Sequence, residues 1–234
     1  MFIVAITGGI ATGKSSVAKI FKDNDIPVID VDLIARQVVE INTPAYKRIR
    51  AEFGEEILLP NGEINRNALG QVAFNDIEKR RILNYITHPP IQKTIYRQIF
   101  KHFLLGHKFV VLDIPLLFET GVFLPYIHKI ITVTCEEDIQ LSRLISRNGL
   151  SEADAKKRIA AQMPLEKKCE LSNFIIENSS GLNDTKEQTL KILEVLLESN
   201  HHWRIRGYVL AATAVFISSI AWLLNLKYKF WSSE

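Results

Sequence analysis

The sequence predicts an α/β fold in which a five-stranded parallel sheet is flanked by helices. Five short runs rich in β-branched residues alternate with longer segments of helical character, as in strands that are joined by helical crossovers. The composition is that of a folded protein, because 47% of the 234 residues are hydrophobic and 24% are charged. Only Cys135 and Cys169 are present, outside any C-x-x-C motif, which excludes a disulfide framework and a thiolate zinc site.

The first strand is expected at residues 2–6, and it leads into a glycine-rich loop. The pattern G-x-x-x-x-G-K-[ST] is met by Gly8-Gly9-Ile10-Ala11-Thr12-Gly13-Lys14-Ser15, and a helix is expected directly after it. Backbone N–H groups of such a loop close around phosphate oxygens, while Lys14 reaches the β and γ phosphates and the Ser15 hydroxyl binds Mg²⁺. We therefore expect all eight residues to bind ATP.

Several classes of protein are excluded by what the sequence lacks. It has no N-K-x-D and D-x-x-G motifs of a GTPase and no L-S-G-G-Q motif of a transporter ATPase, which leaves the small-molecule kinases. Before residue 203 the chain carries 25 basic and 25 acidic residues. Since that part is electrically neutral, no nucleic-acid partner is expected.

The second strand is expected at residues 27–32, and it carries two carboxylates. Asp30 and Asp32 are two residues apart, and hence on one face near the carboxyl end of the strand, where open α/β sheets bind ligands. We expect Asp32 to orient and deprotonate an acceptor hydroxyl. Asp30 is equally suited to cap the following helix. In that helix Arg36 would steer an anionic substrate, and a surface ion pair is its alternative role.

Three further strands are expected at residues 109–113, 130–134 and 174–176. The first of these ends in Asp113, in the manner of a Walker B strand. A carboxylate at that point meets Mg²⁺ directly or through water. We therefore expect Asp113, together with Ser15, to bind the metal.

A helix after the fourth strand places Arg143 and Arg147 four residues apart on one face. Phosphoryl transfer needs cations over the migrating group, and guanidinium groups also stack on adenine. Gly149 then interrupts the chain before a polar helix that carries Arg158. Residues 148–165 are expected to form a mobile lid, although a solvated helical hairpin would have the same pattern.

His88 stands in the segment Thr87-His88-Pro89-Pro90, where a turn or capping role is as plausible as catalysis. The other five histidines are scattered or lie close to the C-terminal tail. No histidine metal site is therefore expected.

A membrane anchor is expected at the C-terminus. Residues 207–226 contain no charge, and as a helix they would span roughly 30 Å, the thickness of a hydrocarbon core. Arg204 and Arg206 precede this run, Lys227 and Lys229 follow it, and aromatic residues lie near both ends. A buried core helix, the alternative, would not need such flanks. We expect residues 203–234 to contact membrane lipid as a tail anchor, with the catalytic domain facing the cytosol, and we favour the mitochondrial outer membrane over the endoplasmic reticulum.

Over about residues 1–200 the motifs together resemble the dephospho-CoA kinase family. The blocks around Ile64-Asn65-Arg66 and residues 115–119 are more specific to it than the phosphate loop, which many kinases share. The matching blocks are Thr7-Gly8-Gly9-Ile10 with Gly13-Lys14-Ser15, Ile29-Asp30-Val31-Asp32 with Ile34-Ala35-Arg36, Gly62-Glu63-Ile64-Asn65-Arg66, Thr87-His88-Pro89, Leu112-Asp113-Ile114-Pro115-Leu116-Leu117-Phe118-Glu119, Gln140-Leu141 with Arg143 and Arg147, and Arg158-Ile159 with Gln162.

The resemblance implies Mg²⁺-assisted transfer of the γ-phosphoryl group of ATP to the ribose 3′-hydroxyl of dephospho-CoA, giving CoA and ADP in the last step of CoA biosynthesis. It implies a kinase domain over residues 1–202, in which residues 44–103 form a helical acceptor-binding part. Asp32 would be the base, and Lys14 and Arg143 would act with it in catalysis. Arg143 and Arg147 would bind the nucleotide, and the substrate would meet Asp32, Arg36, Asn65, Arg66 and His88.

The sequence also departs from the family pattern. Ala11 stands where many relatives have Gly, which is tolerable if Ala11 keeps a negative φ. No H-x-G-H adenylyltransferase motif occurs, which excludes a bifunctional synthase, and the tail resembles that of single-function animal members. Two other functions stay open: a kinase for another acceptor, such as a nucleoside monophosphate, and a membrane-bound, nucleotide-dependent interaction protein without catalysis. The sequence does not define the oligomeric state.

Overall fold

The computed structural model describes residues 1–201, 203, 207, 211, 215, 218 and 219 of the chain. The predicted sheet is confirmed: five parallel strands are arranged in the order β2-β3-β1-β4-β5. The central strands β1 and β3 are almost entirely buried and mostly apolar, as expected for a parallel sheet that is covered on both faces. The strands are β1 (Phe2–Gly8), β2 (Val28–Asp30), β3 (Phe109–Asp113), β4 (Lys129–Thr134) and β5 (Phe174–Glu177).

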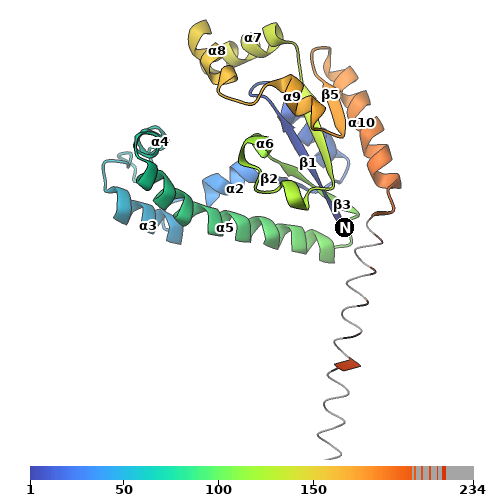
Figure 1. The fold of residues 1–234 in the computed structure, drawn as a ribbon, viewed down its shortest axis with the longest axis horizontal. Coiled ribbons are helices and arrows are strands. Elements are labelled where there is room, and N and C mark those ends of the chain that lie inside the picture. The colour runs from blue at the N-terminus through green and yellow to red at the C-terminus, as the bar shows by residue number, and fades with distance from the viewer. Residues whose placement is uncertain (202, 204–206, 208–210, 212–214, 216–217, 220–234) are drawn as a thin grey trace, which may run out of the picture.

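Helices cover both faces of this sheet (Figure 1). On one face α1 (Lys14–Asp23) and α10 (Leu182–Glu198) pack Phe21 and Leu193 against side chains of β1 and β4. On the other face α2 (Val31–Gln37) and α5 (Ile77–Leu104) pack Ile34 and Ile95 against β3. The chain thus has a doubly covered α/β core, with the phosphate loop at the carboxyl end of its central strand.

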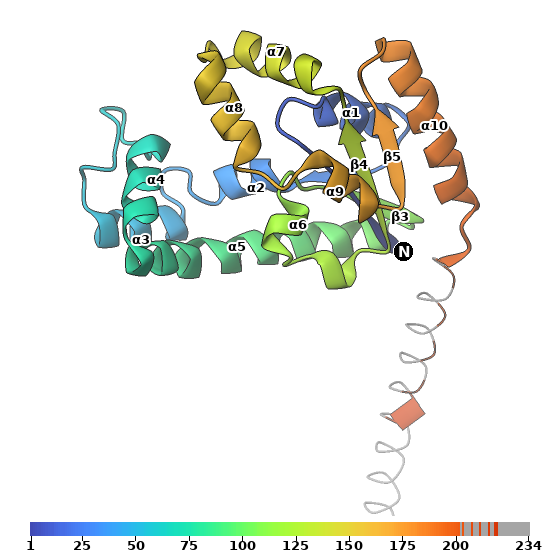
Figure 2. The ribbon, with the colours of Figure 1, turned by 45° about the horizontal axis from the view of Figure 1, so that its top comes forward.

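The predicted helical insertion at residues 44–103 has a hydrophobic core of its own. It consists of α3 (Pro44–Phe53), α4 (Arg66–Asn75) and the first half of α5, which bury Ile49, Leu69 and Ile86 against one another. Figures 1 and 2 show α3 and α4 at one end of the long helix α5, away from the sheet.

The turn or cap considered for His88 as an alternative to catalysis is wrong. Helix α5 runs through Pro89 and Pro90 without a break and leaves His88 exposed in its middle. A proline removes one helical N–H donor, but the flanking Ile86 and Ile95 are buried against neighbouring elements. Their packing holds the helix together, so His88 neither forms a turn nor caps an end.

The second strand is shorter than expected. It ends at Asp30, whose side chain accepts a hydrogen bond of 2.8 Å from the N–H of Leu33 and so caps α2. The helix therefore begins at Val31, and Asp32 lies in its first turn rather than in the strand. The alternative role of Asp30 as a cap is the one that the structure confirms.

The remaining helices follow the third and fourth strands. They are α6 (Leu117–Thr120), the 3₁₀ helix η1 (Leu124–Tyr126), α7 (Glu137–Asn148), α8 (Glu152–Ala160) and α9 (Leu165–Glu170). Gly149, with φ +62°, ends α7, and the Ser151 hydroxyl caps α8 by accepting from the N–H of Asp154, as the expected interruption requires.

In the part of the chain that is described, no helix is long and apolar enough to cross a membrane. Most of the predicted span at 207–226 lies outside that part.

Candidate active site

The phosphate loop joins β1 to α1, and close packing explains its glycines. A Cβ atom on Gly8 would lie 2.5 Å from the carbonyl oxygen of Val133, and one on Gly13 would overlap the side-chain amide of Asn178. Gly13 has φ +91° and stands at the N-cap of α1, where no side chain caps the helix. The first N–H groups of α1 are therefore left for an anionic ligand such as phosphate.

Ala11 corrects one expectation, because its φ is +62° and not negative. The loop turns sharply at this point: both the N–H (3.4 Å) and the hydroxyl (3.0 Å) of Thr12 donate to the carbonyl oxygen of Gly9. For an alanine, the left-handed conformation costs about 1–2 kcal/mol. The loop thus carries local backbone strain at Ala11.

Three amide side chains from distant elements hold the backbone of this loop. Gln140 of α7 donates to the carbonyl oxygen of Ile10 at 2.8 Å, and the carbonyl oxygen of Gln162 accepts from the N–H of the same residue at 2.8 Å. After β5, the buried Asn178 donates to the carbonyl oxygen of Thr12 at 2.7 Å and accepts from the hydroxyl of Thr185. The lid segment and the end of the sheet therefore both fix the loop.

Lys14 and Asp113, both predicted site residues, form a salt bridge at this edge of the sheet. Burial raises the pKa of Asp113, the Lys14 ammonium acts against this, and the charges of Asp30 and Asp32 raise the pKa further. The register of β2 and β3 also pairs Asp30 with Asp113. The structure thus brings Lys14 and three carboxylates together beside the loop.

The donor set fits Mg²⁺. The hydroxyl of Ser15 and the carboxylate of Asp113 are the hard oxygen ligands that this ion prefers. Among the described residues, no group of three or more His, Cys, Asp or Glu side chains is arranged for a metal. A magnesium ion here would take its other ligands from phosphate and water, as it does in most nucleotide sites.

Asp32 and Arg36 lie one turn apart on α2, and both are exposed. The carboxylate of Asp32 is close enough to Asp113 to influence its pKa. Arg36 forms no salt bridge with any described residue, so the alternative of a surface ion pair finds no partner there. Both side chains are free to meet a ligand at the edge of the sheet.

The two arginines of α7 differ in their surroundings. The Nη1 atom of Arg143 is buried without a hydrogen-bond partner, and it lies 3.9 Å from the point where a Cβ on Gly13 would stand. An unpaired buried guanidinium nitrogen beside the loop is suited to a phosphate oxygen. Arg147 is exposed and donates to the side chain of Asn148, and Arg158 of α8 is also exposed. Only Arg143 is brought to the loop.

The other predicted substrate residues lie in the helical insertion. Asn65 caps α4 by accepting from the N–H groups of Asn67 and Ala68. Arg66 and His88 are exposed on α4 and α5, and no contact found among the described residues connects them to the loop. The structure does not bring these three residues together with Lys14 and Asp113.

Sequence reasoning missed one buried cation. Lys168 of α9 is fully buried; its ammonium pairs with Glu119 at 2.7 Å and donates to the carbonyl oxygens of Gly8 and Pro115 at 3.4 Å. Glu119 also accepts from the N–H of Met163 at 3.1 Å. Nothing in the sequence separates Lys168 from the exposed Lys167 beside it, so only the fold identifies this connection between loop, β3 and lid.

Comparisons with known proteins agree with this geometry. The family model described as dephospho-CoA kinase matches residues 2–184. A Danio rerio protein named as dephospho-CoA kinase domain-containing is 46% identical over 212 residues, 91% of this chain and 93% of the relative. An Arabidopsis thaliana dephospho-CoA kinase is 45% identical over 193 residues, 82% of this chain and 83% of the relative.

Two solved structures have the same fold. One from Thermus thermophilus has a TM-score of 0.73 and 30% identity, and it covers 85% of this chain and 98% of its own. A dephospho-CoA kinase from Campylobacter jejuni has a TM-score of 0.61 and 29% identity, and it covers 82% of this chain and 95% of its own. Each solved chain matches over nearly its whole length and corresponds to 82–85% of this chain, so a polypeptide of that length folds on its own.

Proposed function

The chain belongs to the dephospho-CoA kinase family, and we propose its function from this membership and from the geometry of the site. It is a transferase that uses ATP to phosphorylate the ribose 3′-hydroxyl of dephospho-CoA, giving CoA and ADP in the last step of CoA biosynthesis. The observation that carries the donor half of the reaction is the buried, unpartnered Nη1 of Arg143 beside Gly13, at a helix N-terminus without a cap. A guanidinium nitrogen and uncapped backbone N–H groups in one place are suited to bind a phosphate group.

Asp32 acts as the base that orients the acceptor hydroxyl and takes its proton. Its exposed carboxylate stands in the first turn of α2, within electrostatic reach of Asp113 and hence of the loop. Lys14 and Arg143 stabilise the negative charge that spreads over the phosphoryl oxygens during transfer, and the backbone N–H groups hold the other phosphates. Arg147 extends the cationic face of α7 toward the nucleotide.

Ser15 and Asp113 would hold a magnesium ion at the donor site through a hydroxyl and a carboxylate, and such an ion would supply positive charge against the phosphates. Lys14, which pairs with Asp113 in this structure, lies where it can exchange the carboxylate for phosphate oxygens.

Dephospho-CoA binds between α2 and the helical insertion. Arg36 attracts its phosphates, and Arg66 and His88 offer further polar groups on the insertion, while Asn65 shapes the start of α4. Closure of the lid, residues 148–165, excludes water from the transfer. The hydrogen bond from the Ile10 N–H to Gln162 couples the position of the lid to the loop.

The protein is a tail-anchored membrane protein whose catalytic domain faces the cytosol, and the mitochondrial outer membrane is favoured over the endoplasmic reticulum. The support is the uncharged run at residues 207–226, with basic residues on both sides of it.

The experiment that tests the reaction measures ADP release and the phosphorylated product, with dephospho-CoA or AMP as acceptor. We expect ADP release that depends on dephospho-CoA, with CoA as product, and its loss in the Lys14→Ala variant. A higher rate with AMP would replace the acceptor proposed here. ATP binding without any acceptor-dependent ADP release would contradict the assignment of an enzyme.

A further inference from the structure

The second half of α5 presents an exposed face that is both apolar and basic. Apolar side chains recur there every four residues and are 45%, 60% and 68% exposed: Tyr96, Phe100 and Leu104. Basic side chains recur at the same interval and are also exposed: Lys93, Arg97 and Lys101. The helical period places all six within about 140° of the helix circumference. We call these six residues the outer α5 face.

This face is not part of the core. The opposite side of the same helix packs Ile91, Ile95 and Ile99 against the sheet. The outer apolar stripe continues onto η1, because the ring of Tyr126 meets that of Tyr96 edge-on at 6.4 Å and is itself 60% exposed. Contiguous apolar patches of this kind mark interaction surfaces in soluble domains.

The charge of this region is one-sided. No Asp or Glu occurs between Glu78 and Asp113. None of the three basic residues of the face forms a salt bridge within the described part of the chain, whereas exposed lysines of other helices do, such as Lys156 with Glu152 and Lys191 with Glu187. The face therefore offers unneutralised positive charge to an anionic partner.

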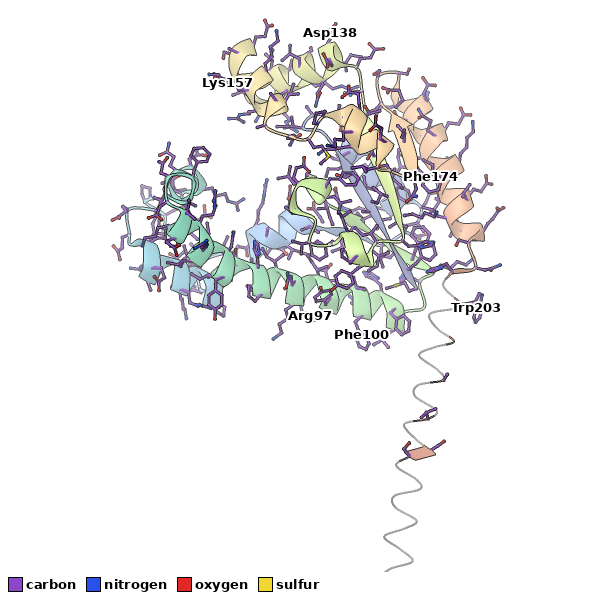
Figure 3. The ribbon with its side chains drawn as sticks, viewed as in Figure 1. Arg97, Phe100, Asp138, Lys157, Phe174 and Trp203 are labelled. Atoms are coloured by element: carbon purple, nitrogen blue, oxygen red, sulfur yellow. The ribbon has the colours of Figure 1, made fainter. Side chains whose placement is uncertain are left out.

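The outer α5 face lies close to the point where the chain leaves the folded domain. Lys108, just beyond α5, donates to the carbonyl oxygen of Leu197 near the end of α10 at 3.0 Å. The ring of His201 stacks on that of His128 at 3.9 Å and meets Phe2 at the base of the sheet. Figure 3 shows Arg97 and Phe100 on the side of α5 that points away from the sheet, with Trp203 near the same edge of the molecule.

We propose that the outer α5 face lies on a bilayer surface that contains anionic lipids. Its aromatic and leucine side chains enter the headgroup region, and its lysines and arginine pair with the acidic headgroups, as in amphipathic helices that lie in the membrane interface. Alternation of apolar and basic residues, absence of acidic ones and nearness to the predicted span favour lipid over a protein partner. This inference does not rest on the kinase reaction.

The test is vesicle flotation with residues 1–202, since relatives of about this length fold on their own. Without the predicted span, binding reports on the folded domain alone. Vesicles of phosphatidylcholine are compared with vesicles that also contain phosphatidylserine, at low and raised salt. We expect flotation only with phosphatidylserine, weakened by salt. The double variant Arg97→Glu and Lys101→Glu should weaken partition at least about tenfold.

The matched control reverses two exposed lysines on the α1 and α10 side of the molecule, Lys22→Glu with Lys186→Glu, and should partition like the unsubstituted domain. A second variant, Phe100→Ser with Leu104→Ser, should also lose binding while cooperative thermal unfolding is retained. Equal loss in the charge-reversed pair and its control, or no preference for phosphatidylserine, would overturn the proposal. A third outcome would also overturn it: the unsubstituted domain does not float but forms a concentration-dependent dimer, and the second variant abolishes that dimer. A second copy of the chain would then cover the face.

Discussion

Ala11 is a residue of the phosphate loop that is not glycine and yet has a positive φ. Its positive φ is required by the turn that closes Thr12 onto Gly9. The motif G-x-x-x-x-G-K-[ST] predicted the loop and its ligand. It did not predict this angle, because it does not specify which residue between the two glycines adopts a left-handed conformation. Strain at a phosphate loop is tolerated when the surrounding packing fixes the backbone.

Replacement of this alanine should therefore stabilise the protein. Ala11→Gly relieves about 1–2 kcal/mol of steric cost in the folded state. It also raises the conformational entropy of the unfolded chain, which lowers the stability by about 0.4–1 kcal/mol. We expect a net gain of about 0.5–1 kcal/mol in the free energy of unfolding, measured by urea denaturation. Loss of stability in this variant would show that Ala11 does not adopt the left-handed conformation.

Lys168 illustrates what the sequence could not predict at this scale. The roles of Lys14, Asp113 and Arg143 were predicted from sequence motifs and from helical spacing. The roles of Lys168 and Asn178 follow from burial, which depends on how α9 and β5 pack against the loop. Such packing leaves no local pattern in the sequence.

Removal of the Lys168 ammonium should destabilise the fold. Lys168→Met leaves Glu119 without its partner, and we expect the free energy of unfolding to fall by about 2–4 kcal/mol, less than for a fully buried pair because Glu119 is 23% exposed. The matched control, Lys167→Met, changes the exposed neighbour and should alter stability little. Similar losses in both variants would refute a special role for Lys168.

The same pair should give stability a defined pH dependence. Burial acts to raise the pKa of Glu119, but hydrogen bonds from Lys168 and the Met163 N–H outweigh it and hold the pKa below its usual value of 4.5. The folded state therefore binds this proton less tightly than the unfolded state, so the stabilisation is present above pH 4.5 and is lost as the pH falls below that value. In urea titrations, the difference in unfolding free energy between wild type and Lys168→Met should shrink as the pH falls below 4.5. A difference that stays constant with pH would contradict this role of the pair.

At the scale of elements, the boundaries moved where side chains compete with the backbone. Asp30 ends β2 early because its carboxylate caps α2, and this shifts Asp32 from a strand into a helix. Pro89 and Pro90 suggested a turn, but the burial of Ile86 and Ile95 carries α5 through them. In both places tertiary packing or capping decided between two locally possible structures.

The lid and the phosphate loop are joined directly by a hydrogen bond from the Ile10 N–H to the side chain of Gln162. The Gln162→Ala variant removes the acceptor of the Ile10 N–H, and one neutral hydrogen bond contributes about 0.5–1.5 kcal/mol. We expect kcat/KM for ATP to fall by about 2- to 10-fold, with a smaller effect on the KM for dephospho-CoA. Steady-state kinetics with each substrate varied would show this, and an unchanged kcat/KM for ATP would separate the lid from the loop.

At the scale of the whole molecule, the alternation of strands and helices predicted the five-stranded parallel sheet, whereas the helical part at residues 44–103 was expected from the family resemblance. The shape of the active site depends on how α2, α7 and the insertion are placed around the loop, which the periodicity of the sequence does not specify.

Two membrane contacts are proposed for the molecule, one through residues 207–226 and one through the outer α5 face. They should respond differently to extraction.

The full-length protein should resist alkaline carbonate, because a spanning helix is held by the hydrocarbon core. A variant truncated after Arg206 should be released from membranes by raised salt and should retain kinase activity. Release of the full-length protein by carbonate would contradict the span. Resistance of the truncated variant to salt would show that another contact dominates.

The assignment of Asp32 as the base in a dephospho-CoA kinase is tested most directly by CoA formation from ATP and dephospho-CoA, measured for the wild type and for Asp32→Asn together with the ATP affinity of each. We expect kcat to fall by about 100- to 10,000-fold in the variant, as for loss of a general base, while ATP binds with unchanged affinity. Full turnover by Asp32→Asn would contradict the mechanism.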